Sequence, residues 1–223
     1  MDGMLRTARS LDGVVRKVGQ GAGWLILPLV AMIIFDVITR KLDFVKEFFA
    51  DITIETGYSI SFLLQDAQWH IHAIILMFTF GFAYLANAHV RVDIFREMMS
   101  RRGQARLELF LLIVLGLPFL AISLWQSFNF AWISFLQGEG SESLTGIGRR
   151  WIIKSTMFIG FTVLALAVFA TILRLVVDLY GDNEQQQAAL AELEIFSEAS
   201  DELEAARLEA ERALEAEKRA ARR

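Results

Sequence analysis

The three histidines are the side chains best suited to metal or haem chemistry, which requires that their spacing brings them together. His70 and His72 are two residues apart, which places them on nearly opposite faces of a helix. His89 lies 19 residues beyond His70, or about 28 Å along a helix. Cysteine is absent, which excludes thiolate zinc sites, iron–sulfur clusters and cysteine nucleophiles. The sequence therefore predicts no metal site and no cofactor.

Catalytic motifs of other kinds are also missing from the sequence. It contains no Ser-His-Asp grouping, no glycine-rich phosphate loop and no metalloprotease motif. The glycines within apolar stretches suit close helix packing instead; they are Gly81, Gly116 and Gly160. A chain that transports a substrate alone usually carries charges near the middle of the membrane. Here Asp36 lies near the end of an apolar stretch, four residues before Arg40, with which it can pair. We therefore expect neither an enzyme nor a self-sufficient transporter.

The composition indicates a membrane protein joined to a charged segment. Of 223 residues, 55% are hydrophobic and 22% are charged, and the mean hydropathy is +0.43. These values are far from those of a soluble domain. From residue 184 onward there are 11 acidic and 6 basic residues, whereas the preceding part has a net charge of +1. Neither part has the basic patch with interleaved aromatics that nucleic-acid binding requires, so no nucleic-acid partner is expected.

Four apolar stretches are long enough to span a bilayer as helices. They lie at about residues 18–38, 69–88, 109–136 and 155–173. The first predicts a retained helix rather than a cleaved signal, because no small-residue cleavage pattern follows it. The third has 28 uncharged residues, about 42 Å as a continuous helix, so it must tilt, kink or leave the membrane. Pro118 is a candidate kink, and Trp125 and Trp132 are candidate interface markers.

Two further helices are predicted outside these spans. Residues of about 44–64 alternate apolar and charged positions at helical spacing. This pattern fits an amphipathic helix on the membrane surface or a loop helix packed on protein. Residues 184–223, rich in Ala, Glu, Leu and Arg, predict a charged helical tail in the cytoplasm, separate from a membrane domain of residues 1–183. Its leucines do not hold a heptad, so a solvated helix is favoured over a coiled coil.

Loop charge predicts the orientation. The N-terminus and the loop after the second stretch carry nine basic residues, and the other two loops carry six. By the positive-inside rule, both termini are expected in the cytoplasm. The fold class is therefore an all-α integral membrane protein with four transmembrane helices, an interfacial amphipathic helix between the first two and a charged C-terminal helix.

Several motifs, taken in order, resemble one family over about residues 18–177. The motif residues are Val37 and Arg40, Asp66 and Trp69 within residues 65–69, His89, Val90, Arg91, Val92 and Asp93, Glu139 and Ser141, and Trp151 and Lys154. Together they resemble the small membrane subunit (DctQ-type small permease) of tripartite ATP-independent periplasmic (TRAP) transporters. The longer segment between the first two helices and the charged tail depart from the usual pattern.

The resemblance implies a non-catalytic scaffold in the bacterial inner membrane. A large membrane subunit would hold an organic acid anion and sodium ions and move them as an elevator, and a periplasmic substrate-binding protein would deliver the anion. This chain would brace the large subunit. The rival hypothesis is a membrane-anchored assembly or signalling protein that acts through its charged C-terminal helix.

The motifs supply candidate contacts to a subunit or to membrane lipids. Those residues are Arg40, Asp66, Trp69, His89, Arg91, Asp93, Glu139, Ser141 and Lys154. Arg91 is expected to meet a partner or a lipid phosphate, with positive-inside anchoring as the alternative. For Arg101, Arg102 and Arg106, simple positive-inside anchoring is favoured over a specific contact. Glu139 and Ser141 lie in a loop that also holds Arg150, where an intraloop salt bridge and a docking contact are both consistent with the sequence.

Overall fold

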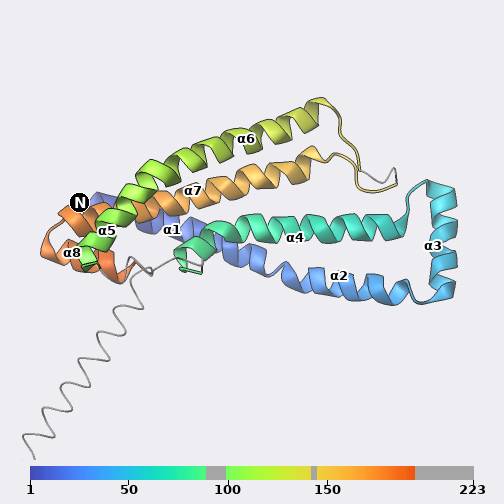
Figure 1. Cartoon of the computed structure of the whole chain (residues 1–223). Helices are drawn as coiled ribbons and strands as arrows, with labels where there is room; N and C mark the ends of the chain where they lie inside the picture. Colours follow the sequence, from blue (N-terminus) through green and yellow to red (C-terminus); the bar gives the residue numbers. More distant parts are fainter. Residues whose placement is uncertain (89–98, 142–144, 194–223) are drawn as a thin grey trace, which may run out of the picture.

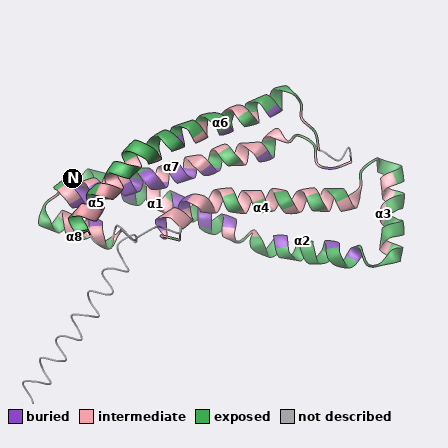
Figure 2. Cartoon of the chain, in the orientation of Figure 1, coloured by how far each residue is buried: buried purple, intermediate pink, exposed green. Residues whose placement is uncertain are grey.

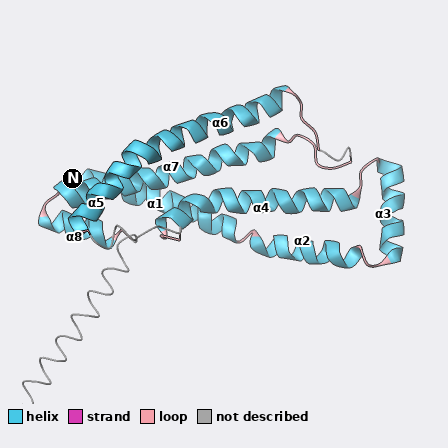
Figure 3. Cartoon of the chain, in the orientation of Figure 1, coloured by secondary structure: helices cyan, strands magenta, loops and turns pink. Residues whose placement is uncertain are grey.

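The computed structural model describes residues 1–88, 99–141 and 145–193, and within these ranges it contains helices and no strand (Figure 3). In chain order the elements are α1 (Asp2–Gly23), α2 (Ile26–Thr39), α3 (Asp43–Thr56), α4 (Ile60–Leu85), α5 (Arg101–Leu111), the π-helical η1 (Leu112–Gly116), α6 (Leu117–Leu136), α7 (Trp151–Tyr180) and α8 (Asn183–Ala191). The predicted all-α class is confirmed.

The long helices lie side by side in an open arrangement rather than a closed bundle (Figure 1). α4 packs against α7, α7 against α6, and α2 against α4, so α2 and α6 lie at opposite edges. α1 packs against both α4 and α7 at the end that holds the N-terminus. α7 is central and contributes more buried residues than any other described helix (Figure 2).

Two glycines set the spacing between the central helices. A Cβ atom added at Gly81 of α4 would lie 2.8 Å from the carbonyl oxygen of Val163, and one added at Gly160 of α7 would lie 2.7 Å from that of Met77. Only glycine permits so close a backbone approach. The predicted packing role is confirmed for both, whereas the atoms nearest to Gly116 belong to its own helical segment.

The first span begins much earlier than the apolar stretch at 18–38. α1 starts at Asp2 because Leu5, Ala8 and Val15 recur at helical spacing and are buried against the neighbouring helices. The charged side chains between them hide this pattern from a search for uncharged runs. The chain then breaks briefly between α1 and α2, at Trp24 and Leu25.

The third span is one continuous helical run from Arg101 to Leu136 with a π segment just before Pro118. Pro118 has no backbone N–H and crowds the preceding turn. The N–H of Leu117 bonds to the carbonyl of Leu112, five residues earlier, which is a π-type hydrogen bond. The predicted irregularity is therefore present as a π segment inside the helix.

α3 lies across the end of the layer, between α2 and α4 (Figure 1). It ends at Thr56 and is followed by Gly57, whose φ of 75° is the left-handed conformation that glycine adopts readily. The predicted interfacial helix is thus shorter than 44–64, and α4 starts at Ile60 rather than 69. α3 packs on α4 yet leaves Phe44 and Phe48 exposed, at 70% and 60%.

α8 packs against α7, although the sequence alone assigns its residues to the charged tail. Asp182 forms a capping box with Gln185, which starts the helix. Ala189 is buried with Leu5 and Val177, and Leu193 is buried with Ala105 and Leu175. Residues 183–193 therefore pack with the membrane helices, and the rest of the predicted tail lies outside the described residues.

Candidate functional site

Asp66 ties the loop between α6 and α7 to α4. One carboxylate oxygen accepts a hydrogen bond from the indole N–H of Trp69 at 3.1 Å. The other accepts from the hydroxyl of Ser141 and from the backbone N–H of Ile147, both at 2.8 Å. Because carboxylates only accept, these three donors satisfy both oxygens of one side chain. Three of the predicted contact residues therefore meet in one place.

Glu139 forms a second set of contacts in the same loop. Lys154 donates a hydrogen bond to its carboxylate, and the guanidinium of Arg150 lies 3.9 Å from it. The backbone N–H of Arg150 donates to the carbonyl of Glu139 at 3.0 Å. The Lys154 hydrogen bond holds the pKa of Glu139 below its ordinary value, and the charges of Lys154 and Arg150 also lower this pKa. Burial alone would raise it, but its effect is outweighed. The carboxylate is therefore ionised at neutral pH.

Aromatic rings flank both cations. The guanidinium carbon of Arg150 lies 5.6 Å from the Trp69 ring centroid, and the Lys154 ammonium lies 4.1 Å from that of Phe130. Both distances fall within the range of cation–π attraction. The two cationic side chains are each 18% exposed. Asp66, Trp69, Glu139, Ser141 and Lys154 thus belong to one network, defined here as the loop cluster.

Arg40 lies apart from the loop cluster. Its Nε donates to Asp36 at 3.0 Å, which is the predicted pairing four residues apart. The motif that contains His89, Arg91 and Asp93 lies outside the described residues. Of the predicted contact residues that the structure describes, all but Arg40 join the loop cluster.

A second charged network lies at the opposite end of α7, and sequence reasoning missed it. Arg174 is 3% exposed; its guanidinium lies 3.4 Å from Asp12 of α1 and 3.0 Å from Glu192, which follows α8. Arg9 also contacts Glu192, at 2.6 Å. One sequence feature points to this network: charged and apolar residues recur at helical spacing from Asp2 onward, which predicts that α1 is an amphipathic helix packed on its neighbours.

Arg101 is also part of this end of the molecule. Its guanidinium lies 2.7 Å from the carboxylate of Asp178, whose side chain is 4% exposed. Simple surface anchoring, which the sequence favours for Arg101, is therefore wrong, because the residue neutralises a buried carboxylate between α5 and α7.

The fold defines the class of protein. In the described part of the chain, four helical runs are long and apolar enough to cross a membrane: Asp2–Thr39, Ile60–Leu85, Arg101–Leu136 and Trp151–Tyr180. Together with the exposed apolar surfaces, they identify a multi-pass, all-helical membrane protein.

Comparison with known families refines this class. A family model described as "Tripartite ATP-independent periplasmic transporters, DctQ component" matches residues 29–178, from α2 to α7. The chain belongs to this family and is a small TRAP transporter permease component. Neither the curated proteins nor the solved structures gave a match.

Proposed function

We propose that this chain is the non-catalytic scaffold of a sodium-driven transporter that takes up organic acid anions, and that it braces the large elevator-type membrane subunit. The observation that carries the proposal is the apolar exposure of the edge helices. In α6, Ile122, Trp125 and Leu136 are 65%, 67% and 66% exposed, and Leu27 and Ile34 of α2 are 59% and 54% exposed. In a membrane, such surfaces face lipid or another subunit.

The internal contacts support a rigid, stationary role. Close backbone approach at Gly81 and Gly160 locks α4 to α7. The loop cluster links α4, α7 and the intervening loop at one end, and Arg174 links α1, α7 and the segment after α8 at the other. The charged side chains of α4 and α7 lie toward helix ends rather than mid-span, and α6 (Leu117–Leu136) has none. This distribution favours a partner subunit over a substrate pathway.

The loop cluster is proposed to face the periplasm and to meet the periplasmic substrate-binding protein. The basic-residue count, which places both termini in the cytoplasm, supports this orientation. A cysteine introduced at Gly103, in the first turn of α5, should react with a membrane-impermeant thiol reagent only from the cytoplasmic side. Reaction from the outside of intact cells would reverse the assignment.

Photo-crosslinking to the large subunit tests the scaffold role. A photoreactive residue at Ile122 of α6 and another at Ile34 of α2 should crosslink to the large subunit when the subunits are produced together. One crosslinked edge would identify the bracing surface. If neither edge helix crosslinks although the subunits purify together, bracing through these helices is wrong.

A further inference from the structure

A pocket of about 330 Å³ lies between α4, α6 and α7 beside the loop cluster. Trp69, Ala73 and Met77 line it from α4, Phe130 from α6, and Ile153, Lys154, Thr156 and Met157 from the start of α7, with Arg150 just before that helix. The residues on α4 recur every four positions, so the pocket follows the helix for eight residues, or about 12 Å. It is therefore elongated along the direction in which the helices cross the membrane.

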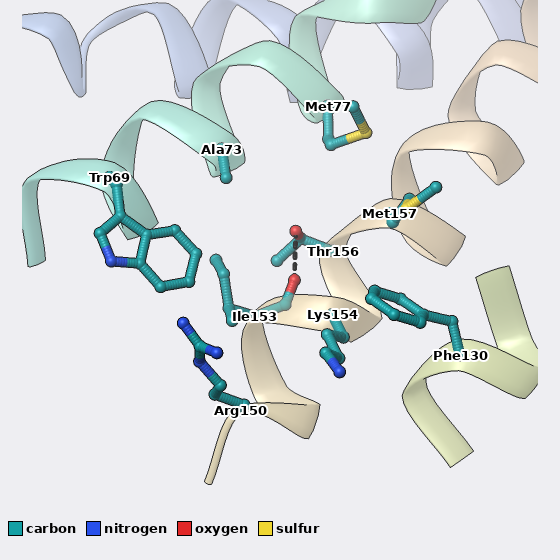
Figure 4. Close-up of a pocket in the computed structure, with 9 residues that line it drawn as sticks. All are labelled: Trp69, Ala73, Met77, Phe130, Arg150, Ile153, Lys154, Thr156 and Met157. Carbon is teal, nitrogen blue, oxygen red and sulfur yellow. Dashed lines mark hydrogen bonds between the residues drawn. The ribbon is translucent and has the colours of Figure 1, made fainter. Parts of the chain in front are cut away.

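The two ends of the pocket differ in chemistry. Figure 4 shows the guanidinium of Arg150 near the Trp69 indole and the Lys154 ammonium on the same side. Met77 and Met157 lie at the other end. Arg150 and Lys154 both line this end and both carry a positive charge, which attracts an anionic oxygen. This end can therefore hold an anionic group.

The wall between the two ends is apolar. Thr156 donates its hydroxyl to the carbonyl of Ile153 at 2.7 Å, so this donor is used within α7 (Figure 4). Ala73, Met77, Ile153 and Met157 supply the rest of the surface. Methionine side chains are flexible and adapt to irregular apolar partners. The wall is suited to a hydrocarbon chain.

We propose that this pocket binds one phospholipid of the bilayer, with its phosphate at the end lined by Arg150 and Lys154 and an acyl chain along Ala73, Met77 and Met157. A phospholipid matches the two ends of the pocket, because its phosphate lies at the membrane surface and its acyl chain extends toward the membrane interior. A helix of a partner subunit is about 10 Å wide, so it would cover a pocket of this volume rather than fill it. The bound lipid would fill the space between α4, α6 and α7.

The purified full-length chain in a non-ionic detergent, mixed with phosphatidylglycerol, provides the test. Native mass spectrometry should show one retained lipid per chain. Arg150→Gln should weaken retention by about tenfold, as expected for loss of a charge-assisted hydrogen bond. Arg149→Gln is the matched control, because Arg149 is an exposed neighbour that does not line the pocket. Equal retention in both variants would overturn the proposal.

Two further measurements separate the lipid from other occupants. Met157→Trp fills the apolar end but leaves both cations, and it should also reduce retention; unchanged retention would show that the chain does not lie in the pocket. Excess inorganic phosphate should not displace the lipid, and displacement would identify a free-anion site instead. In the complex, a photoreactive residue at Met157 should crosslink to lipid, and crosslinking to the large subunit instead would identify a protein contact. The thermal unfolding of each variant checks that it is folded.

Discussion

Asp66 of α4 and Ser141, 75 residues later in the chain, are joined by a hydrogen bond of 2.8 Å. The same carboxylate also accepts from the backbone of Ile147. One side chain thus holds two points of the loop between α6 and α7 against the start of α4. This loop also carries Glu139, so the position of Glu139 depends on Asp66.

Replacing Asp66 should loosen this loop. Asp66→Ala leaves the Ser141 hydroxyl and the Ile147 N–H without their acceptor, so the free energy of unfolding should fall by about 1–3 kcal/mol. Asp43→Ala is a suitable control, because Asp43 is exposed and pairs with the exposed Lys46, and it should change stability little. Thermal unfolding of the purified chain in detergent measures both. Equal shifts would show that the Asp66 contacts do not hold the loop.

The Glu139–Lys154 pair should make stability depend on pH in the acid range. The pKa of Glu139 is below its ordinary value of 4.5, so its contribution is present above that value and is lost as the pH falls through the lowered pKa. Glu139→Gln should remove this part of the pH dependence. The melting temperature followed from neutral pH downward provides the readout. An unchanged slope in the variant would place the pH dependence elsewhere.

Removing Arg174 should be far more damaging than removing an exposed arginine. Arg174→Ala leaves Asp12 and Glu192 without their buried cation, at a cost of about 3–5 kcal/mol. Arg106 is exposed, and Arg106→Ala should cost about 1 kcal/mol or less. The yield of folded protein and its melting temperature compare the two. Similar losses would contradict the structural role of Arg174.

Two truncations locate the boundary of the dispensable tail. A stop after Leu193 should preserve complex assembly, because Ala189, Glu192 and Leu193 keep their contacts with α1, α5 and α7. A stop after Asp182 removes these contacts and should lower stability and assembly, although the sequence alone assigns residues 184–223 to a tail separate from the membrane domain. If the longer truncated chain folds but fails to assemble, residues 194–223 act as an interaction segment, and the rival hypothesis of a membrane-anchored assembly protein gains support.

The apolar spans could be predicted from sequence because hydrophobic length is a local property, and α4, α6 and α7 lie where such runs indicate. The motif residues could be named individually, but their convergence could not be inferred. Asp66 and Ser141 meet only because α4 begins at Ile60, well before its uncharged stretch. Arg174 was missed for a related reason. A charge at the end of an apolar run resembles a membrane anchor until its partners on α1 are known.

We propose that this chain is required for transport but does not carry the substrate. Proteoliposomes containing this chain and its large subunit, supplied with the periplasmic binding protein and an imposed sodium gradient, test it directly. We predict uptake of a labelled organic acid anion by the complete system and none by either membrane subunit alone. Sodium-dependent uptake by this chain alone, or full uptake by the large subunit without it, would contradict the scaffold role.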